Sequence, residues 1–325
     1  MVIIGCSIVA IILALLWTQM LMNRRNQNRY HCAGRLHMIG QRKLHIDVSG
    51  QSEAPTVVFD HGSEYGASSL TWHMVAERVE HFSRVVTYDR AGYGFSDGGS
   101  YPRTSMDHVD DLHQLLLAEN ITGPVIIVGH GYGALNARLF AYRFPKQVSG
   151  IILVDALHED EHTNKYPEQY MKEQLKLQKR YKRYTLLNYI GVAKGLLRLQ
   201  RPLHQLFNHY PMAIRQQMWT LIALNKTVKT IANEQAHIEQ VFNQVRKVKS
   251  YKNIPVTVII GGKMVDDSND LMQARYALAA QMKKLSEEGL LIIAPNSDRH
   301  VPTEQPEVVA DAIRRMINHL KSEYV

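Results

Sequence analysis

The chain contains little cysteine, since Cys6 and Cys32 are the two among its 325 residues. Two cysteines cannot build the disulfide framework of a small secreted domain, and neither has neighbours at metal-ligand spacing. Internal repeats and low-complexity tracts are also absent from the sequence, so nothing indicates a repeat architecture. The length and the hydrophobic content of 45% suffice for one large α/β domain with an insertion, or for two modest domains.

Charged residues are missing from the first 22 residues. Residues 2–22 are apolar apart from four scattered small or polar residues, and such a run can cross a bilayer about 30 Å thick. A cleaved signal peptide would have a basic start and a small-residue cleavage site, and neither is present. We therefore predict a single-pass anchor at 1–22 and a basic juxtamembrane linker at 23–40. Arginines follow the run but do not precede it, which favours a cytoplasmic globular part.

Beyond the linker, apolar β-branched segments alternate with helical stretches. Strands are predicted at 44–48, 56–60, 85–88, 125–128, 150–155, 255–262 and 290–294. Helices are predicted at 70–82, 106–120, 135–144, 271–287 and 306–320. This alternation is typical of an α/β fold with a mostly parallel sheet covered on both faces, with a core at 41–155 and 255–325.

Strand signals disappear between residues 156 and 254, where we predict a helical cap or lid inserted between two strands of the sheet. Residues 162–252 hold 17 Lys and Arg against 4 Asp and Glu, a net charge of +13, while the whole chain carries +8. Most charge-rich helices are simply solvated. Behind a membrane anchor, however, a basic face with Tyr and Leu residues also suits anionic lipid headgroups. Nucleic acid is disfavoured because no recognised binding module accompanies the charge.

The most informative stretch is VIIVGHGYGA at 125–134, a buried strand that ends in three alternating glycines and enters a helix. Two chemistries use such a turn. In the nucleophile elbow, G-x-S-x-G, a strained turn lifts a serine hydroxyl above the sheet. In the dinucleotide fingerprint, G-x-G-x-x-G/A, glycines let a pyrophosphate approach the helix. The spacing fits both motifs, with Gly131 in the serine position of the first and Ala134 closing the second.

Several further motifs occur in a specific order, and together they resemble the α/β-hydrolase family. They are His61-Gly62, DRAGYGFSD at 89–97, GHGYG at 129–133, a strand that ends in Asp155, the helical insertion and a late His300. The resemblance covers nearly all of the chain from residue 34 onward and is closest to bacterial membrane-associated or exported hydrolases. It implies an acyl or lipid-like ligand and neither a metal nor an organic cofactor.

The resemblance also implies catalytic roles. His300, between the last strand and the last helix, fills the position of the family's histidine. The acid follows either the strand after the elbow, as Asp155, or the strand after the insertion, as Asp266 or Asp267. Whichever residue serves must accept a hydrogen bond from His300 and hold its tautomer. The backbone N–H groups of Ser63 and Tyr132 are expected to form the oxyanion hole.

Gly131 departs from the family's pattern, because glycine offers no oxygen or sulfur to form an acyl-enzyme. Three interpretations follow. The site has lost its nucleophile and now binds a ligand, or His300 and its acid act directly on water or on a substrate proton. Alternatively, residues 129–134 bind a nucleotide and Asp155 binds its ribose. The last interpretation leaves His61-Gly62, the loop at 89–97 and His300 without a role.

Overall fold

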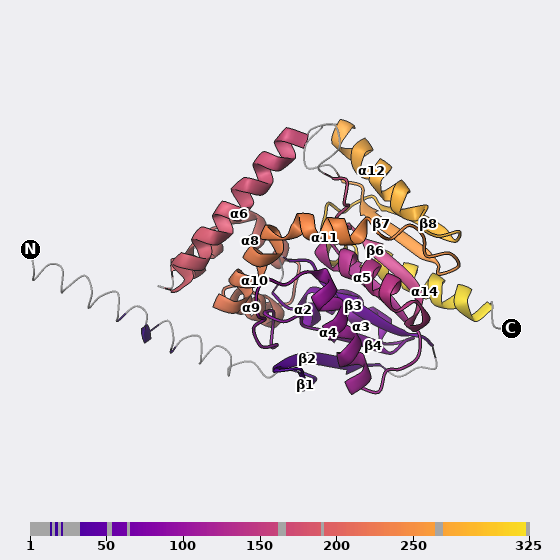
Figure 1. Cartoon of the computed structure of the whole chain (residues 1–325), viewed down its shortest axis with the longest axis horizontal. Helices are drawn as coiled ribbons and strands as arrows, with labels where there is room; N and C mark the ends of the chain where they lie inside the picture. Colours follow the sequence, from indigo (N-terminus) through magenta and orange to yellow (C-terminus); the bar gives the residue numbers. More distant parts are fainter. Residues whose placement is uncertain are drawn as a thin grey trace, which may run out of the picture.

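The computed structural model describes residues 33–50, 54–63, 66–161, 167–189, 192–263 and 269–322 (Figure 1). It also describes four single residues near the start of the chain, at positions 14, 17, 18 and 21. At its centre is an eight-stranded sheet in the order β1-β2-β4-β3-β5-β6-β7-β8. β2 runs antiparallel to both of its neighbours, and the strands from β4 across to β8 pair in parallel. The strands are β1 (Arg35–Ile39), β2 (Arg42–Ser49), β3 (Thr56–Asp60), β4 (Val85–Tyr88), β5 (Val125–His130), β6 (Val148–Val154), β7 (Val256–Gly261) and β8 (Gly289–Ala294). The predicted α/β fold is confirmed.

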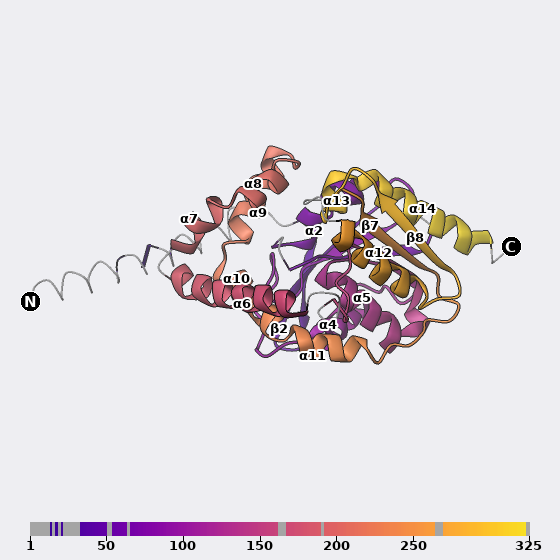
Figure 2. The ribbon, with the colours of Figure 1, turned by 90° about the horizontal axis from the view of Figure 1, so that it is seen from above.

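Helices cover both faces of the sheet, as Figures 1 and 2 show. On one face lie α3 (His73–Val79) and α14 (Pro306–Ser322), and on the other lie α4 (Ser105–Ala118), α5 (Tyr132–Arg143) and α12 (Asn269–Lys283). The buried residues of α14 recur every three or four positions, so one apolar stripe packs on the sheet. β5 is buried along its whole length, which explains why its sequence is a continuous apolar run.

Two predicted boundaries differ from the structure. The core begins before residue 41, because residues 35–39 of the predicted linker form β1 and pair with β2 through a turn at Gly40. The stretch predicted as one helix at 70–82 is two, α2 (Ser68–Thr71) and α3, because Trp72 leaves the helical conformation between them. Trp72 is fully buried against Phe59, with ring centroids 4.8 Å apart, so its tertiary contact outweighs the local helical pattern.

The predicted insertion is helical, but its helices do not all belong to a separate cap. The helices are α6 (Pro167–Tyr189), α7 (Val192–Arg198), α8 (Arg201–Phe207), α9 (Met212–Leu221), α10 (Asn225–Ala236) and α11 (Ile238–Val245). The apolar stripe of α11 lies in the main core beside α4 and α5. A separate apolar cluster joins α8 and α9 to Ala67 and Leu70 of the body. The end of the insertion is therefore part of the body, and α6–α9 lie at one end of the molecule (Figure 2).

The anchor predicted at 1–22 falls outside the described residues except for four positions. Among the residues that the structure does describe, no helix combines the length and the apolar composition needed to cross a bilayer.

Candidate active site

The turn at Gly131, between β5 and α5, has the geometry of a nucleophile elbow. Gly131 adopts φ 55° and ψ −114°, a region that side-chain-bearing residues rarely occupy. Its N–H donates to the carbonyl of Val154 at 3.1 Å, and its carbonyl accepts from the N–H of Leu157 at 3.3 Å. These hydrogen bonds join the elbow to the end of β6 and to the segment after it, which carries Asp155. The fold therefore brings the elbow and this candidate acid to one edge of the sheet.

The three glycines of the turn differ in what a side chain would meet. A Cβ on Gly129 would lie 2.4 Å from the carbonyl oxygen of Gly133, and a Cβ on Gly133 would lie 2.5 Å from that of Asp60. A Cβ on Gly131 would meet the Cα of Gly62 at 3.7 Å, which is ordinary van der Waals contact. The outer glycines are thus required by close backbone approach, whereas the central position has room for a side chain.

The predicted oxyanion hole lies next to this position. Gly62 and Ser63 follow β3, and Gly62 is the residue that a side chain at 131 would contact. Tyr132 is the first residue of α5, where helix N–H groups have no acceptor within the helix and the helix dipole favours negative charge. The two N–H groups can therefore stabilise an oxyanion, and this role stays a prediction.

The residues that flank Gly131 turn their side chains into the protein. Burial lowers the pKa of His130 to about 4, so its ring is neutral near pH 7. Its Nε2 is 2.9 Å from the carbonyl oxygen of Arg299, and it must donate there because a carbonyl only accepts. The ring of Tyr132 lies over the buried guanidinium of Arg90, 5.3 Å from its Cζ. Both side chains are therefore held inside the protein, and the hydrogen bond of His130 positions the residue before His300.

The loop that carries His300 connects β8 with the short helix α13 (Val301–Glu304). The carboxylate of Glu304 accepts from the hydroxyl of Ser297 at 2.8 Å and from the N–H of Asp298 at 2.7 Å. The carbonyl of His300 itself accepts from the N–H groups of Thr303 and Glu304. These bonds hold the half-buried His300 at the carboxyl end of the sheet, as predicted from its place in the sequence.

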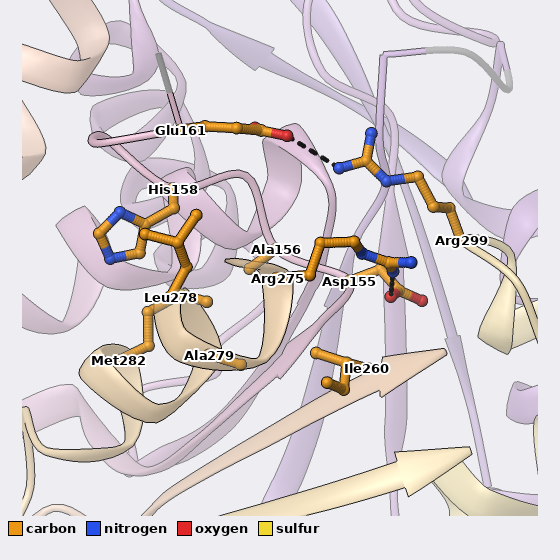
Figure 3. Close-up of a pocket in the computed structure, with 10 residues that line it drawn as sticks. All are labelled: Asp155, Ala156, His158, Glu161, Ile260, Arg275, Leu278, Ala279, Met282 and Arg299. Atoms are coloured by element: carbon orange, nitrogen blue, oxygen red, sulfur yellow. Dashed lines mark hydrogen bonds and ion pairs between the residues drawn. The ribbon is translucent and has the colours of Figure 1, made fainter. Parts of the chain in front are cut away.

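Asp155, at the end of β6, has a partner that the sequence did not predict. Its Oδ1 accepts from the N–H of Gly261 at 2.9 Å. It also accepts from Nη2 of Arg275 in α12 at 2.9 Å (Figure 3). Its Oδ2 is buried without a hydrogen-bond partner in the described part of the chain. Burial raises the pKa of Asp155 to about 6, although Gly261, Arg275, Arg299 and His300 all act to lower it. His300 is thus within electrostatic range of Asp155, and the unpaired Oδ2 is the atom that could accept from it.

The raised pKa of Asp155 predicts a measurable loss of stability with pH. The folded state binds this proton more tightly than the unfolded chain does, so its stabilising contribution is lost as pH rises from about 4 to about 6. The shift corresponds to about 3 kcal/mol of unfolding free energy. Asp155→Asn should remove this pH dependence in thermal unfolding between pH 4 and pH 7. The control is Asp110→Asn, which changes an aspartate at the surface and should keep the pH dependence. Equal pH profiles for the native protein and Asp155→Asn would contradict the assignment.

Other predicted features have different outcomes. Asp266 and Asp267 lie outside the described residues. Asp155 is 8% exposed and its Oδ1 accepts from two protein donors, and the nucleotide interpretation stays a prediction that these contacts do not test. Within the described ranges, no group of three or more His, Cys, Asp and Glu residues could hold a metal ion.

Sequence reasoning missed a buried polar network beneath the site. Arg90, fully buried, donates through Nη1 to Asp60 and through Nη2 to Glu234 of α10, the latter at 3.1 Å. The other Glu234 oxygen accepts from the hydroxyl of Tyr93 at 2.7 Å. Tyr88 and Asp60 are also joined, at 2.6 Å. The loop at 89–97 supplies Arg90 and Tyr93, but no sequence signal links these residues to Glu234.

The sequence profile of the alpha/beta hydrolase family matches residues 57–312. The chain belongs to this family. The uncharacterized protein YqjL of Bacillus subtilis is 34% identical over 112 residues, which are 34% of this chain and 44% of YqjL. An uncharacterized vacuolar membrane protein of Saccharomyces cerevisiae is 31% identical over 116 residues, which are 35% of this chain and 18% of that protein.

Among solved structures, a thermophilic esterase from Thermogutta terrifontis matches with a TM-score of 0.62 and 19% identity, covering 87% of this chain and 96% of the esterase. That likeness shows the α/β-hydrolase fold alone. The chain spans less than half the length of the curated relatives named above.

Proposed function

We propose that this α/β-hydrolase-family protein has an ester- or acyl-hydrolase-type pocket whose nucleophile is absent, so that it binds an acyl ligand and has little or no acyl-enzyme activity. The observation that carries the proposal is Gly131, which has the backbone geometry of an elbow and space for a Cβ but no nucleophilic atom. The proposed oxyanion hole at Ser63 and Tyr132, the base His300 and the acid Asp155 accompany it. Asp266 is the second candidate for the acid, on sequence grounds.

A cavity in the cap supports the proposal that the protein binds an acyl ligand. It has a volume of about 170 Å³ and is lined by Arg180, Tyr181, Tyr184, Leu197, Gln200, Leu203, Ile222, Val228 and Ile231. Five of these residues are aliphatic, and the polar groups come mainly from α6 and Gln200. Ile222 also touches the body, because a Cβ on Gly66, which follows the oxyanion segment, would lie 3.1 Å from its backbone nitrogen. Ile222 thus joins the lining of this cavity to the segment that follows Ser63, which supports the proposal.

The native chain is expected to hydrolyse short and medium acyl esters no faster than a His300→Ala variant. Without a nucleophile, the oxyanion hole and substrate binding alone give a rate acceleration of at most about 10³- to 10⁴-fold over the reaction in water. Neither contribution depends on the imidazole. Initial rates with p-nitrophenyl acetate and octanoate would measure this, with Asp110→Asn as a surface control.

The other catalytic interpretation gives a different result in the same assay. If the native chain turns over these esters and His300→Ala abolishes turnover, the binding role is wrong. His300 and an acid would then act as a dyad on water or on a substrate proton. The proximity of Asp155 to His300 makes this the alternative that the assay must exclude.

We also propose that the protein is attached to a membrane through residues 1–22, with the globular part in the cytoplasm. The support is the uncharged apolar run itself and the arginines that follow it. The Saccharomyces cerevisiae relative is named as a vacuolar membrane protein, which is compatible with membrane attachment.

A further inference from the structure

Helix α6 presents a predominantly basic face to solvent after its first two turns, which hold Glu168 and Glu173. Between residues 174 and 189 the helix holds five Lys and Arg and neither Asp nor Glu. Lys172, Lys179 and Arg183 follow one another at helical spacing, with Lys176 between them, and all four are exposed. Figures 1 and 2 place α6 at the periphery of the cap, at the end of the molecule away from β8.

Aliphatic side chains are interleaved with these cations. Leu175 is 50% exposed and Leu186 is 70% exposed, and both lie within about 60° of Lys172 around the helix axis. Leu199 and Met212, elsewhere in the cap, are 78% and 68% exposed. Isolated exposed Leu residues are ordinary, but two of them interleaved with cations on one helix face are typical of a helix that lies on a membrane surface.

The opposite side of α6 is fixed to the rest of the cap, so the basic face is directed outward. Gln178 donates to the carbonyl of Gln235 at 3.0 Å, and Asn188 donates to that of Ala223 at 3.0 Å. The hydroxyl of Tyr184 accepts from Gln200 at 2.8 Å. These contacts come from three other parts of the cap, and they hold the helix in one rotation about its axis.

We propose that this α6 face, formed by Lys172, Leu175, Lys179, Arg183 and Leu186, docks on the surface of an anionic lipid bilayer. The cations would contact phosphate and carboxylate groups of the lipid headgroups, while the two leucines enter the boundary with the acyl chains. A single-stranded nucleic acid fits less well, because it requires aromatic platforms for its bases rather than exposed leucines. The surface is distinct from the site at Gly131, and its test does not depend on ester chemistry.

The test is vesicle flotation of the full chain, with phosphatidylcholine vesicles compared with vesicles containing 30% phosphatidylserine. The ratio of the two partition coefficients cancels insertion of the uncharged residues 1–22, and the basic linker at 23–40 contributes equally to the native chain and to every variant. Each Lys or Arg near an anionic surface contributes a factor of about five, so Lys172→Gln, Lys179→Gln and Arg183→Gln together should reduce the ratio roughly 100-fold. High salt should reduce it for the native chain as well.

The matched control removes three exposed lysines from the body, Lys146, Lys283 and Lys284, and should leave the ratio within about fivefold of native. Thermal unfolding midpoints of both triple variants should match that of the native protein. An equal ratio in the α6 variant and the native chain overturns the proposal, as does an equal loss in the control. The proposal is also overturned if the native chain binds oligo-dT but not vesicles, and the α6 variant loses the binding to oligo-dT.

Discussion

The Gly131→Ser variant gains ester hydrolysis, by on the order of 10⁴- to 10⁶-fold over the native chain. This range reflects what removal of the nucleophile costs serine hydrolases. The structure accommodates the new side chain, since its Cβ would contact Gly62 at 3.7 Å and meets no closer described neighbour. The backbone conformation, φ 55°, is unfavourable for serine, so the variant loses about 1–3 kcal/mol of stability. Initial rates with p-nitrophenyl esters and a thermal unfolding scan measure both effects.

Two further variants separate the catalytic effect of the serine hydroxyl from the effect of backbone strain on stability. Gly131→Ala adds the same Cβ in the same conformation, so it should lose similar stability and gain no activity. His300→Ala in the Gly131→Ser background should remove the gain. The activity should also fall below about pH 6, because Asp155 then takes up a proton and cannot accept from the imidazole. If Gly131→Ser folds and remains inactive on all acyl lengths, the proposed active site is wrong.

The Glu234→Gln variant loses about 3–5 kcal/mol of stability, the typical cost of removing one partner from a buried ion pair. Arg90 and Glu234 are both fully buried, and Asp60 is the second anion beside the guanidinium. Burial alone would lower the pKa of Arg90, but the carboxylates of Glu234 and Asp60 raise it well above its usual value. The arginine keeps its charge in the variant because a guanidinium is not deprotonated in proteins, and it then has one carboxylate beside it instead of two.

The expected change in the unfolding midpoint is a decrease of about 10 °C, measured by circular dichroism. Glu239→Gln is the matched control, because Glu239 is an exposed glutamate of the same insertion and its loss should shift the midpoint by no more than about 2 °C. A similarly small shift for Glu234→Gln would show that the contact between Glu234 of α10 and Arg90 does not stabilise the fold.

The sequence determined the order of the elements and the nature of the turn at Gly131. Strands β3 and β4 begin and end at the predicted residues, because short β-branched runs bounded by turn residues carry their own local signal. The elbow was readable because three alternating glycines after a buried strand have few structural uses. The place of His300, before the last helix, followed from the same order of strands and helices. The anchor at 1–22 and the acid role of Asp266 or Asp267 remain predictions from the sequence, because most of the first range and all of the second lie outside the described residues.

The tertiary structure decided which groups meet across long separations. Arg275 lies 120 positions from Asp155, and Glu234 lies 144 positions from Arg90, so neither contact leaves a periodic or local trace in the sequence. It also decided that Gly129 and Gly133 are required by close backbone approach whereas Gly131 has room for a side chain. Local patterns specify helices and strands because their hydrogen bonds join near neighbours. Pairing of buried charges depends on where the packed elements finally lie, and sequence spacing does not encode that position.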